Sequence, residues 1–187
     1  MARIEVFNRE IIMNKSVEYI RKYGISMLNV RSLASFIGCS TQPLFRNFEN
    51  INEFKSDLKK YLHKDYENFI SKYVDKDDYL YTISYAYALY GKENPNIFNA
   101  LFITDLAGSR TVSEVVNSSW NRETIICMTK QYNINLEDAE KVYRDVRFYT
   151  HGIGAQLCCK SIKLSNDELG NLIRNMINMR VNFIRGD

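Results

Sequence analysis

VRSLASFIGCSTQPLFRNFEN (residues 30–50) holds two short helical patterns that meet at a turn. The first repeats its apolar residues at helical spacing and ends at Gly38 after about two turns. Asn29 precedes it as a good N-cap, and Ser40 is placed to cap a second helix that begins at Thr41. Pro43 falls in the first turn of that helix, where a backbone N–H has no intrahelical acceptor in any case.

The second helix has distinct inner and outer faces. Leu44 and Phe48 are four residues apart and can face a core, which leaves Thr41, Gln42 and Arg46 outside. A helix, a turn and a short polar-faced helix make the arrangement of a helix-turn-helix, whose second helix enters the DNA major groove. Gln can pair with adenine, Arg with guanine or phosphate, and a Thr methyl can contact a thymine methyl. An ordinary helical hairpin with a polar surface fits the pattern about equally well.

The composition favours an all-α fold. The 187 residues include only 8 Gly and 2 Pro, and 45% of the chain is apolar, which suits long helices with short connections. No apolar run approaches the roughly 20 residues that span a bilayer, so we expect no membrane partner. The N-terminus reaches charged residues at once and shows no signal-peptide pattern, so we expect a cytoplasmic protein.

The positive charge is concentrated near the N-terminus. Residues 1–50 hold seven basic and four acidic residues, a net charge of +3, which equals the net charge of the whole chain. The remaining residues are therefore neutral overall. This is the charge distribution expected of a protein that binds a polyanion through its N-terminal segment.

Residues 11–54 resemble the DNA-binding domain of the TetR family of transcriptional regulators. The matching positions, in register, are Gly24, Leu33-Ala34, Gly38, Ser40, Leu44-Phe45, Phe48 and Phe54. The resemblance implies about nine helices: a DNA-binding domain over residues 1–50 and a helical effector-binding and dimerisation domain over 51–187, with 51–74 as the connecting helix. The DNA contacts that it implies, together with the outward residues above, are Asn29, Arg31, Ser40, Thr41, Gln42, Pro43, Phe45, Arg46, Asn52 and Lys55.

Two positions depart from the family pattern. The family usually has a tyrosine where this chain has Phe45 and a lysine where it has Ile51, and both usual residues are polar. Lys55, one turn further on, can partly replace the missing charge. Backbone N–H groups near Asn52 are expected to be available to a phosphate.

The C-terminal half contains further helix signals and two apolar seams. Residues 111–114 (TVSE) and 165–168 (SNDE) are capping-box patterns that open helices, and Asn94 precedes a helix that starts at Pro95. Heptad-like seams suit a bundle formed across a twofold axis, as does the family resemblance. The predicted dimer interface is Val142, Val146, Tyr149, Ile153, Leu169, Leu172, Met176, Met179 and Phe183. Alternatively, both seams pack against the chain's own core.

An effector pocket is expected among the helices of residues 78–160, because bundle interiors often hold ligands. Aromatic residues there suit a small hydrophobic or aromatic effector. The expected lining residues are Tyr85, Phe98, Phe102, Met128 and His151. His151-Gly152 is similar to a His-Gly pair of one TetR subgroup, which usually has a tryptophan where this chain has Arg147. Plain core packing is the alternative for each of these residues.

The sequence favours a regulator over an enzyme. It contains no phosphate-binding loop, no zinc-protease motif and no nucleophile elbow, so we expect no catalytic residues, no metal and no cofactor. The leading hypothesis is a dimeric repressor that binds a palindromic double-stranded operator and is released by a small molecule. The alternative is a helical dimer with weakened DNA binding that acts through a protein partner.

Overall fold

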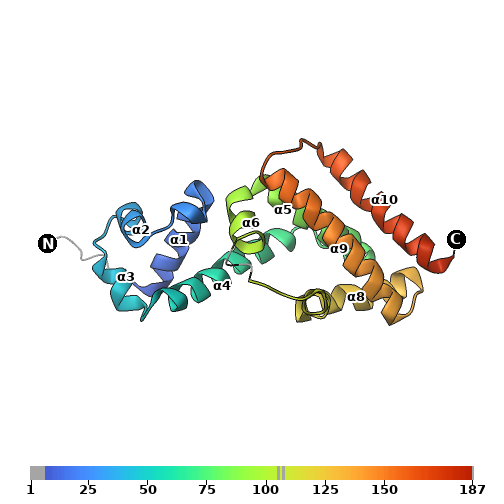
Figure 1. The fold of residues 1–187 in the computed structure, drawn as a ribbon, viewed down its shortest axis with the longest axis horizontal. Helices are drawn as coiled ribbons and strands as arrows, with labels where there is room; N and C mark the ends of the chain where they lie inside the picture. The colour runs from blue at the N-terminus through green and yellow to red at the C-terminus, as the bar shows by residue number, and fades with distance from the viewer. Residues whose placement is uncertain (1–6, 105, 107, 187) are drawn as a thin grey trace. The chain divides into compact units, whose positions relative to one another are not determined.

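A computed structural model describes residues 7–104, 106 and 108–186, and in this part of the chain the fold is all-α, as predicted (Figure 1). Ten α-helices and two short 3-10 helices, with no strand, account for the regular structure of these residues. The elements of the first half are α1 (Arg9–Tyr23), η1 (Ile25–Met27), α2 (Val30–Ile37), α3 (Gln42–Asn47), α4 (Ile51–Ile70) and η2 (Lys76–Asp78). Those of the second half are α5 (Tyr79–Glu93), α6 (Pro95–Phe102), α7 (Val112–Val116), α8 (Ser119–Tyr132), α9 (Leu136–Cys158) and α10 (Asn166–Arg185).

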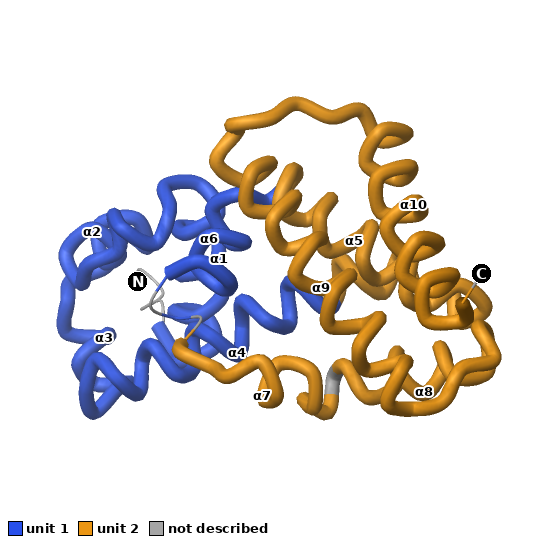
Figure 2. The backbone as a smooth tube through the Cα atoms, turned by 45° about the vertical axis from the view of Figure 1, so that its right-hand side comes forward, with its two compact units in different colours: residues 1–67, 94–107 blue, residues 68–93, 108–187 orange. Residues whose placement is uncertain are grey.

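The chain divides into two compact units, and the division is not the one expected after residue 50 (Figure 2). Unit 1 comprises residues 1–67 and 94–107, and unit 2 comprises residues 68–93 and 108–187. Most of α4 belongs to unit 1, where Phe54 packs on Phe48 and Asp57 forms an ion pair with Arg9 of α1. Helix α6 belongs there too, since the Asn96 side-chain amide donates to the Arg21 carbonyl oxygen at 3.0 Å.

Local capping explains where most helices begin and end. The Asn29 side chain accepts from the Ser32 N–H at 2.9 Å, and Gly38 closes α2 in the left-handed conformation with φ 84°. The two predicted capping boxes, at residues 111–114 and 165–168, are confirmed. The predicted cap at Ser40 is wrong: Thr41 occupies the N-cap position of α3, and its side chain makes no capping hydrogen bond.

The core of unit 2 lies among α5, α8, α9 and α10, with α9 and α10 antiparallel and side by side (Figure 1). Its apolar residues include Leu80, Leu89, Ile125, Met128, Val142, Val146, Ile153, Leu169, Ile173, Ile177 and Val181. Helices α5 and α9 approach very closely at Gly91, where an added Cβ would lie 2.7 Å from the Gly154 carbonyl oxygen. Gly152 has open space around it, so of the two glycines on α9 only Gly154 permits this approach.

The structure splits the predicted dimer seams into a buried part and an exposed part. Val142, Val146, Ile153 and Leu169 lie in the core of unit 2 and are at most 6% exposed, so their assignment to a dimer interface is corrected to core packing. Tyr149 and Met176 are half-buried against that core. Leu172, Met179 and Phe183 are 37%, 59% and 70% exposed, so they are the residues of the predicted seams that are most accessible to a second chain.

Two kinds of feature are missing from the described ranges. No group of three or more His, Cys, Asp or Glu side chains in them is placed to hold a metal ion. No helix in them is both long and apolar enough to cross a bilayer.

Candidate nucleic-acid interface

One face of helices α2 and α3 packs against the interior of unit 1, and the opposite face is exposed to solvent. Leu33 and Ala34 of α2 are 1% and 3% exposed, and Leu44 of α3 is 5% exposed. Phe48, which follows α3, packs edge-to-face on Phe54 of α4 with ring centroids 5.1 Å apart. The predicted inner face is therefore confirmed, and the opposite face is exposed to solvent.

The ten residues predicted to contact DNA all lie at least partly on the surface. Thr41 and Pro43 are half-buried, and the other eight are exposed: Asn29, Arg31, Ser40, Gln42, Phe45, Arg46, Asn52 and Lys55. Six of the ten fall within residues 40–46, on α3 or the turn before it. This segment therefore offers amide, guanidinium and hydroxyl groups, which are the groups that read base edges in a major groove.

Two positive charges on this face are not neutralised by the part of the chain that the structure describes. Three basic residues of α1 form ion pairs, Arg9 with Glu53 and Asp57, Lys15 with Glu18, and Arg21 with Asp65. Arg31 and Arg46 form no ion pair with any residue that the structure describes. The sequence has no acidic residue between Glu18 and Glu49, a signal that the charge count over residues 1–50 did not bring out.

The N-terminus of α4 differs from expectation. The Asn52 and Glu53 backbone N–H groups both donate to the Asn50 side-chain oxygen at 3.0 Å, so Asn50 is the N-cap of α4. The prediction that N–H groups near Asn52 are available to a phosphate therefore does not hold for these two groups, because the cap already uses them. The exposed side chains of Asn52 and Lys55 remain available at this end of the helix.

Arg9 fixes the position of α3, and sequence reasoning missed it. Its guanidinium donates to Asp57 at 2.6 Å, to Glu53 at 2.7 Å and to the Asn47 carbonyl oxygen at the end of α3 at 3.3 Å. It also lies 4.8 Å from the centroid of the Phe48 ring. One residue of α1 therefore ties the end of α3 to the first turns of α4, which holds the exposed face of α3 in a fixed position.

These contacts also lower the pKa values of the two carboxylic acids involved, Glu53 and Asp57. Hydrogen bonds from the Glu49 backbone N–H and then from Arg9 lower the pKa of Glu53. Hydrogen bonds from Lys60 and then from Arg9 lower the pKa of Asp57. Both carboxylates are therefore charged at neutral pH, and Arg9 is occupied by them and is not available to a phosphate.

The five expected effector residues are spread over both units. Phe98 and Phe102 belong to unit 1, where Phe98 is fully buried and Phe102 packs on Tyr66 with ring centroids 5.2 Å apart. Tyr85, Met128 and His151 belong to unit 2, and Met128 is fully buried in its core. Phe98 and Met128 are therefore accounted for by core packing.

His151 has a defined polar environment in unit 2. Its Nδ1 lies 2.8 Å from the Tyr87 hydroxyl, and the Arg147 guanidinium lies 4.0 Å from the centroid of the Tyr87 ring. Burial and then the nearby charge of Arg147 lower the pKa of His151. Arg147, at the position where the resembling subgroup has a tryptophan, therefore contributes a cation beside this pair and favours the neutral imidazole.

Comparison with protein-family models gives no match for this chain, and comparison with curated proteins gives none either. The functional interpretation therefore depends on the residues of this chain and on their geometry.

Proposed function

We propose that this protein is a dimeric DNA-binding transcriptional regulator of the TetR type, a repressor whose operator binding is relieved by a small molecule. The observation that carries the proposal is the outer face of α2 and α3. It presents Gln42, Arg31 and Arg46 to solvent, without ion pairs to the two arginines among the described residues and without an acidic residue in the segment. A surface of this kind suits a polyanion with hydrogen-bonding base edges.

The residues have distinct roles in the proposed complex. Arg31 of α2 and Lys55 of α4 contact phosphates, which gives affinity that depends on salt but not on sequence. Gln42 and Arg46 of α3 read base edges, and the Thr41 methyl packs on a thymine methyl. Arg9 takes no part in DNA contact, because its hydrogen bonds to Glu53 and Asp57 hold α3 in place.

Dimerisation is proposed through the exposed apolar side chains of α10. Leu172, Met179 and Phe183 are large, apolar and between 37% and 70% exposed on this one helix. Exposed apolar side chains grouped on one helix suit burial against a second copy. A twofold dimer would bind a palindromic operator with half-sites about one helical turn apart.

The effector is proposed to bind in unit 2, near Tyr85 and His151. The hydroxyl of Tyr87 and the imidazole of His151 form a polar pair, with the Arg147 guanidinium beside it, next to the apolar core of unit 2. An apolar interior with few polar groups is typical of sites for small hydrophobic or aromatic molecules.

Titration of the protein with the duplex that flanks its own gene, over a series of salt concentrations, tests the proposal. Log affinity should fall linearly with log salt, with a slope of about −0.9 for each phosphate neutralised. Gln42→Ala with Arg46→Ala should cost about 1–3 kcal/mol for each lost base contact and leave the fold intact. Lys163→Ala is the matched control, because it removes an exposed positive charge from unit 2 and should bind as the parent does.

Two exposed side chains favour a second function, a helical dimer that acts through a protein partner. Phe45 is 69% exposed and Ile51 is 55% exposed, on the face that would meet DNA. Both are apolar where a phosphate contact needs a polar group. Absence of duplex binding even at low salt would refute the DNA-binding proposal and favour this alternative.

A further inference from the structure

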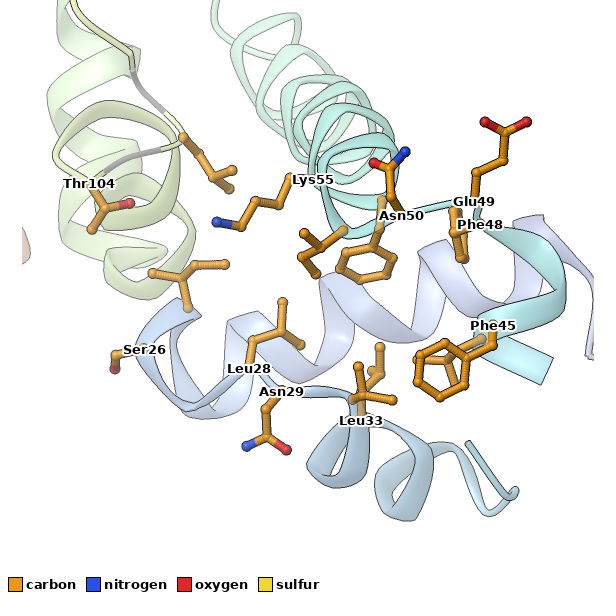
Figure 3. Close-up of a pocket in the computed structure, with 16 residues that line it drawn as sticks. Ser26, Leu28, Asn29, Leu33, Phe45, Phe48, Glu49, Asn50, Lys55 and Thr104 are labelled. Atoms are coloured by element: carbon orange, nitrogen blue, oxygen red, sulfur yellow. The ribbon is translucent and has the colours of Figure 1, made fainter. Parts of the chain in front are cut away.

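Unit 1 contains a pocket with a volume of about 580 Å³, separate from the expected effector site (Figure 3). It is lined by η1, α2, α3 and the start of α4, together with Thr104 and Leu106 after α6. Its lining is mainly apolar: Ile25, Leu28, Val30, Leu33, Leu44, Phe45, Phe48, Ile51, Phe54 and Leu106. The volume falls within the roughly 300–1,000 Å³ of small-molecule sites.

Two apolar side chains on the rim of the pocket are exposed, among polar and charged ones, whereas the floor is buried. Phe45 and Ile51 are 69% and 55% exposed, while Leu33, Leu44 and Phe54 are at most 7% exposed. Large apolar side chains left in water are costly, and two of them on the rim of one apolar hollow mark it as a surface that a ligand covers. The pocket therefore has a buried apolar floor and two exposed apolar side chains that a bound molecule would cover.

Two charged residues line the pocket, Glu49 and Lys55, and neither side chain forms an ion pair with a residue that the structure describes. The polar side chains Asn29, Asn50 and Thr104 are used within the protein, the first two as helix caps and the third as a donor to the Ala100 carbonyl oxygen at 3.1 Å. Lys55 forms no hydrogen bond or ion pair with a residue that the structure describes. It extends from α4 toward the segment that carries Thr104, whereas the Glu49 carboxylate points away from the apolar lining (Figure 3).

We infer that this pocket binds a small amphipathic anion, a molecule with a linear aliphatic body and one carboxylate. The aliphatic body lies on Leu28, Leu33 and Phe54 and is covered at the rim by Phe45 and Ile51. The carboxylate pairs with the Lys55 ammonium. Charge complementarity selects an anion over a neutral or cationic molecule, because Lys55 supplies the one unpaired charge directed into the described lining.

The inference is tested by calorimetry with dodecanoate, kept below its micelle concentration and without DNA, so the result does not depend on the proposed DNA contacts. Each methylene that is buried should strengthen binding about fourfold. Octanoate, decanoate and dodecanoate differ by two methylenes at each step and should therefore bind with affinities that rise roughly fifteenfold at each step. Equal affinity for the three chain lengths would show that the apolar floor is not the site, and no binding of dodecanoate would overturn the inference.

Two variants separate the charge from the apolar rim. Lys55→Gln should weaken dodecanoate roughly threefold to tenfold and leave dodecanol unchanged, since only the carboxylate pairs with the ammonium. Ile51→Ser should weaken dodecanoate and dodecanol alike. Met27→Ser is the matched control, because Met27 is 59% exposed in the same unit but does not line the pocket.

The remaining outcomes also decide the question. Equal loss of dodecanol and dodecanoate in Lys55→Gln would refute the pairing with Lys55. Far-UV circular dichroism that matches the parent shows that each variant is folded, and the rim side chains are exposed enough to change without cavity formation. A dimer that Phe45→Ser dissociates, in a protein that binds no dodecanoate, would assign the pocket to a second copy of the chain and overturn the inference.

Discussion

The close approach of α5 and α9 allows a sharp test of the packing in unit 2. In Gly91→Ala the new Cβ would lie 2.7 Å from the Gly154 carbonyl oxygen and 3.2 Å from its carbonyl carbon. Both are backbone atoms of α9, so no side-chain rotation can relieve the contact. The two helices must move apart, and the movement disturbs the packing of neighbouring core residues such as Leu89 and Ile153.

The expected loss follows from two opposed effects. Overpacking of a close interface typically costs about 1–3 kcal/mol. Replacing glycine by alanine inside a helix returns about 0.5–1 kcal/mol, because the unfolded chain loses less conformational freedom on folding. The steric term is the larger of the two, so Gly91→Ala should destabilise the protein by roughly 1–2 kcal/mol. In a chain of this length that lowers the melting temperature by about 2–8 °C.

Gly152→Ala is the matched control, because Gly152 lies on α9 of the same unit and has nothing within 4 Å of an added Cβ. It should gain only the stabilisation that comes from replacing glycine by alanine inside a helix. It should therefore melt at the parent temperature or up to about 4 °C above it. Thermal melts followed by far-UV circular dichroism compare the three proteins. If Gly91→Ala melts as high as Gly152→Ala, then α5 and α9 do not approach at Gly91 and Gly154 as described.

Three further outcomes follow from single contacts. Asn29→Ala removes the cap of α2 and should cost about 1 kcal/mol in urea unfolding, whereas an unchanged midpoint would mean that the cap is not formed. Glu53 and Asp57 have lowered pKa values when folded, so the stability that they contribute is present at neutral pH and is lost as the pH falls below about 4.5. Urea midpoints measured from pH 6 to pH 3 should show this loss, and Arg9→Met should show a smaller one. Phe183→Ser should dissociate the proposed dimer in sedimentation experiments and change subunit stability by no more than about 0.5 kcal/mol, because the side chain is 70% exposed. Sedimentation that matches the parent would exclude Phe183 from the interface.

Features that depend on neighbours in sequence could be predicted. The capping boxes at residues 111–114 and 165–168 need only a side chain and an N–H three residues apart, and both form. Gly24 and Gly38 end their helices at positive φ for the same local reason. The inner residues Leu44 and Phe48 were predicted from helical spacing and are buried.

Features that depend on distant partners could not be predicted. Arg9 meets Asp57 across 48 residues of sequence and Asn96 meets Arg21 across 75, so nothing in either local pattern indicates the pairing. These contacts join α4 and α6 to α1, so the boundary between the two units does not fall at residue 50. The two predicted dimer seams illustrate the same point. Their apolar repeats are equally regular, yet Val146 is fully buried and Phe183 is 70% exposed. Periodicity identifies an apolar face but not the element that covers it.

Phe45 and Ile51 show why single positions could not be interpreted from the sequence alone. At a DNA interface each would remove a phosphate contact, because an apolar side chain has no group that can donate a hydrogen bond to a phosphate oxygen. In the structure both line one pocket, which Lys55 also lines, above a buried apolar floor. An apolar side chain at such a position is unfavourable in water and favourable beneath a ligand. The same two residues that weaken the case for phosphate contact therefore carry the case for an amphipathic ligand, and binding measurements with and without DNA separate the two roles.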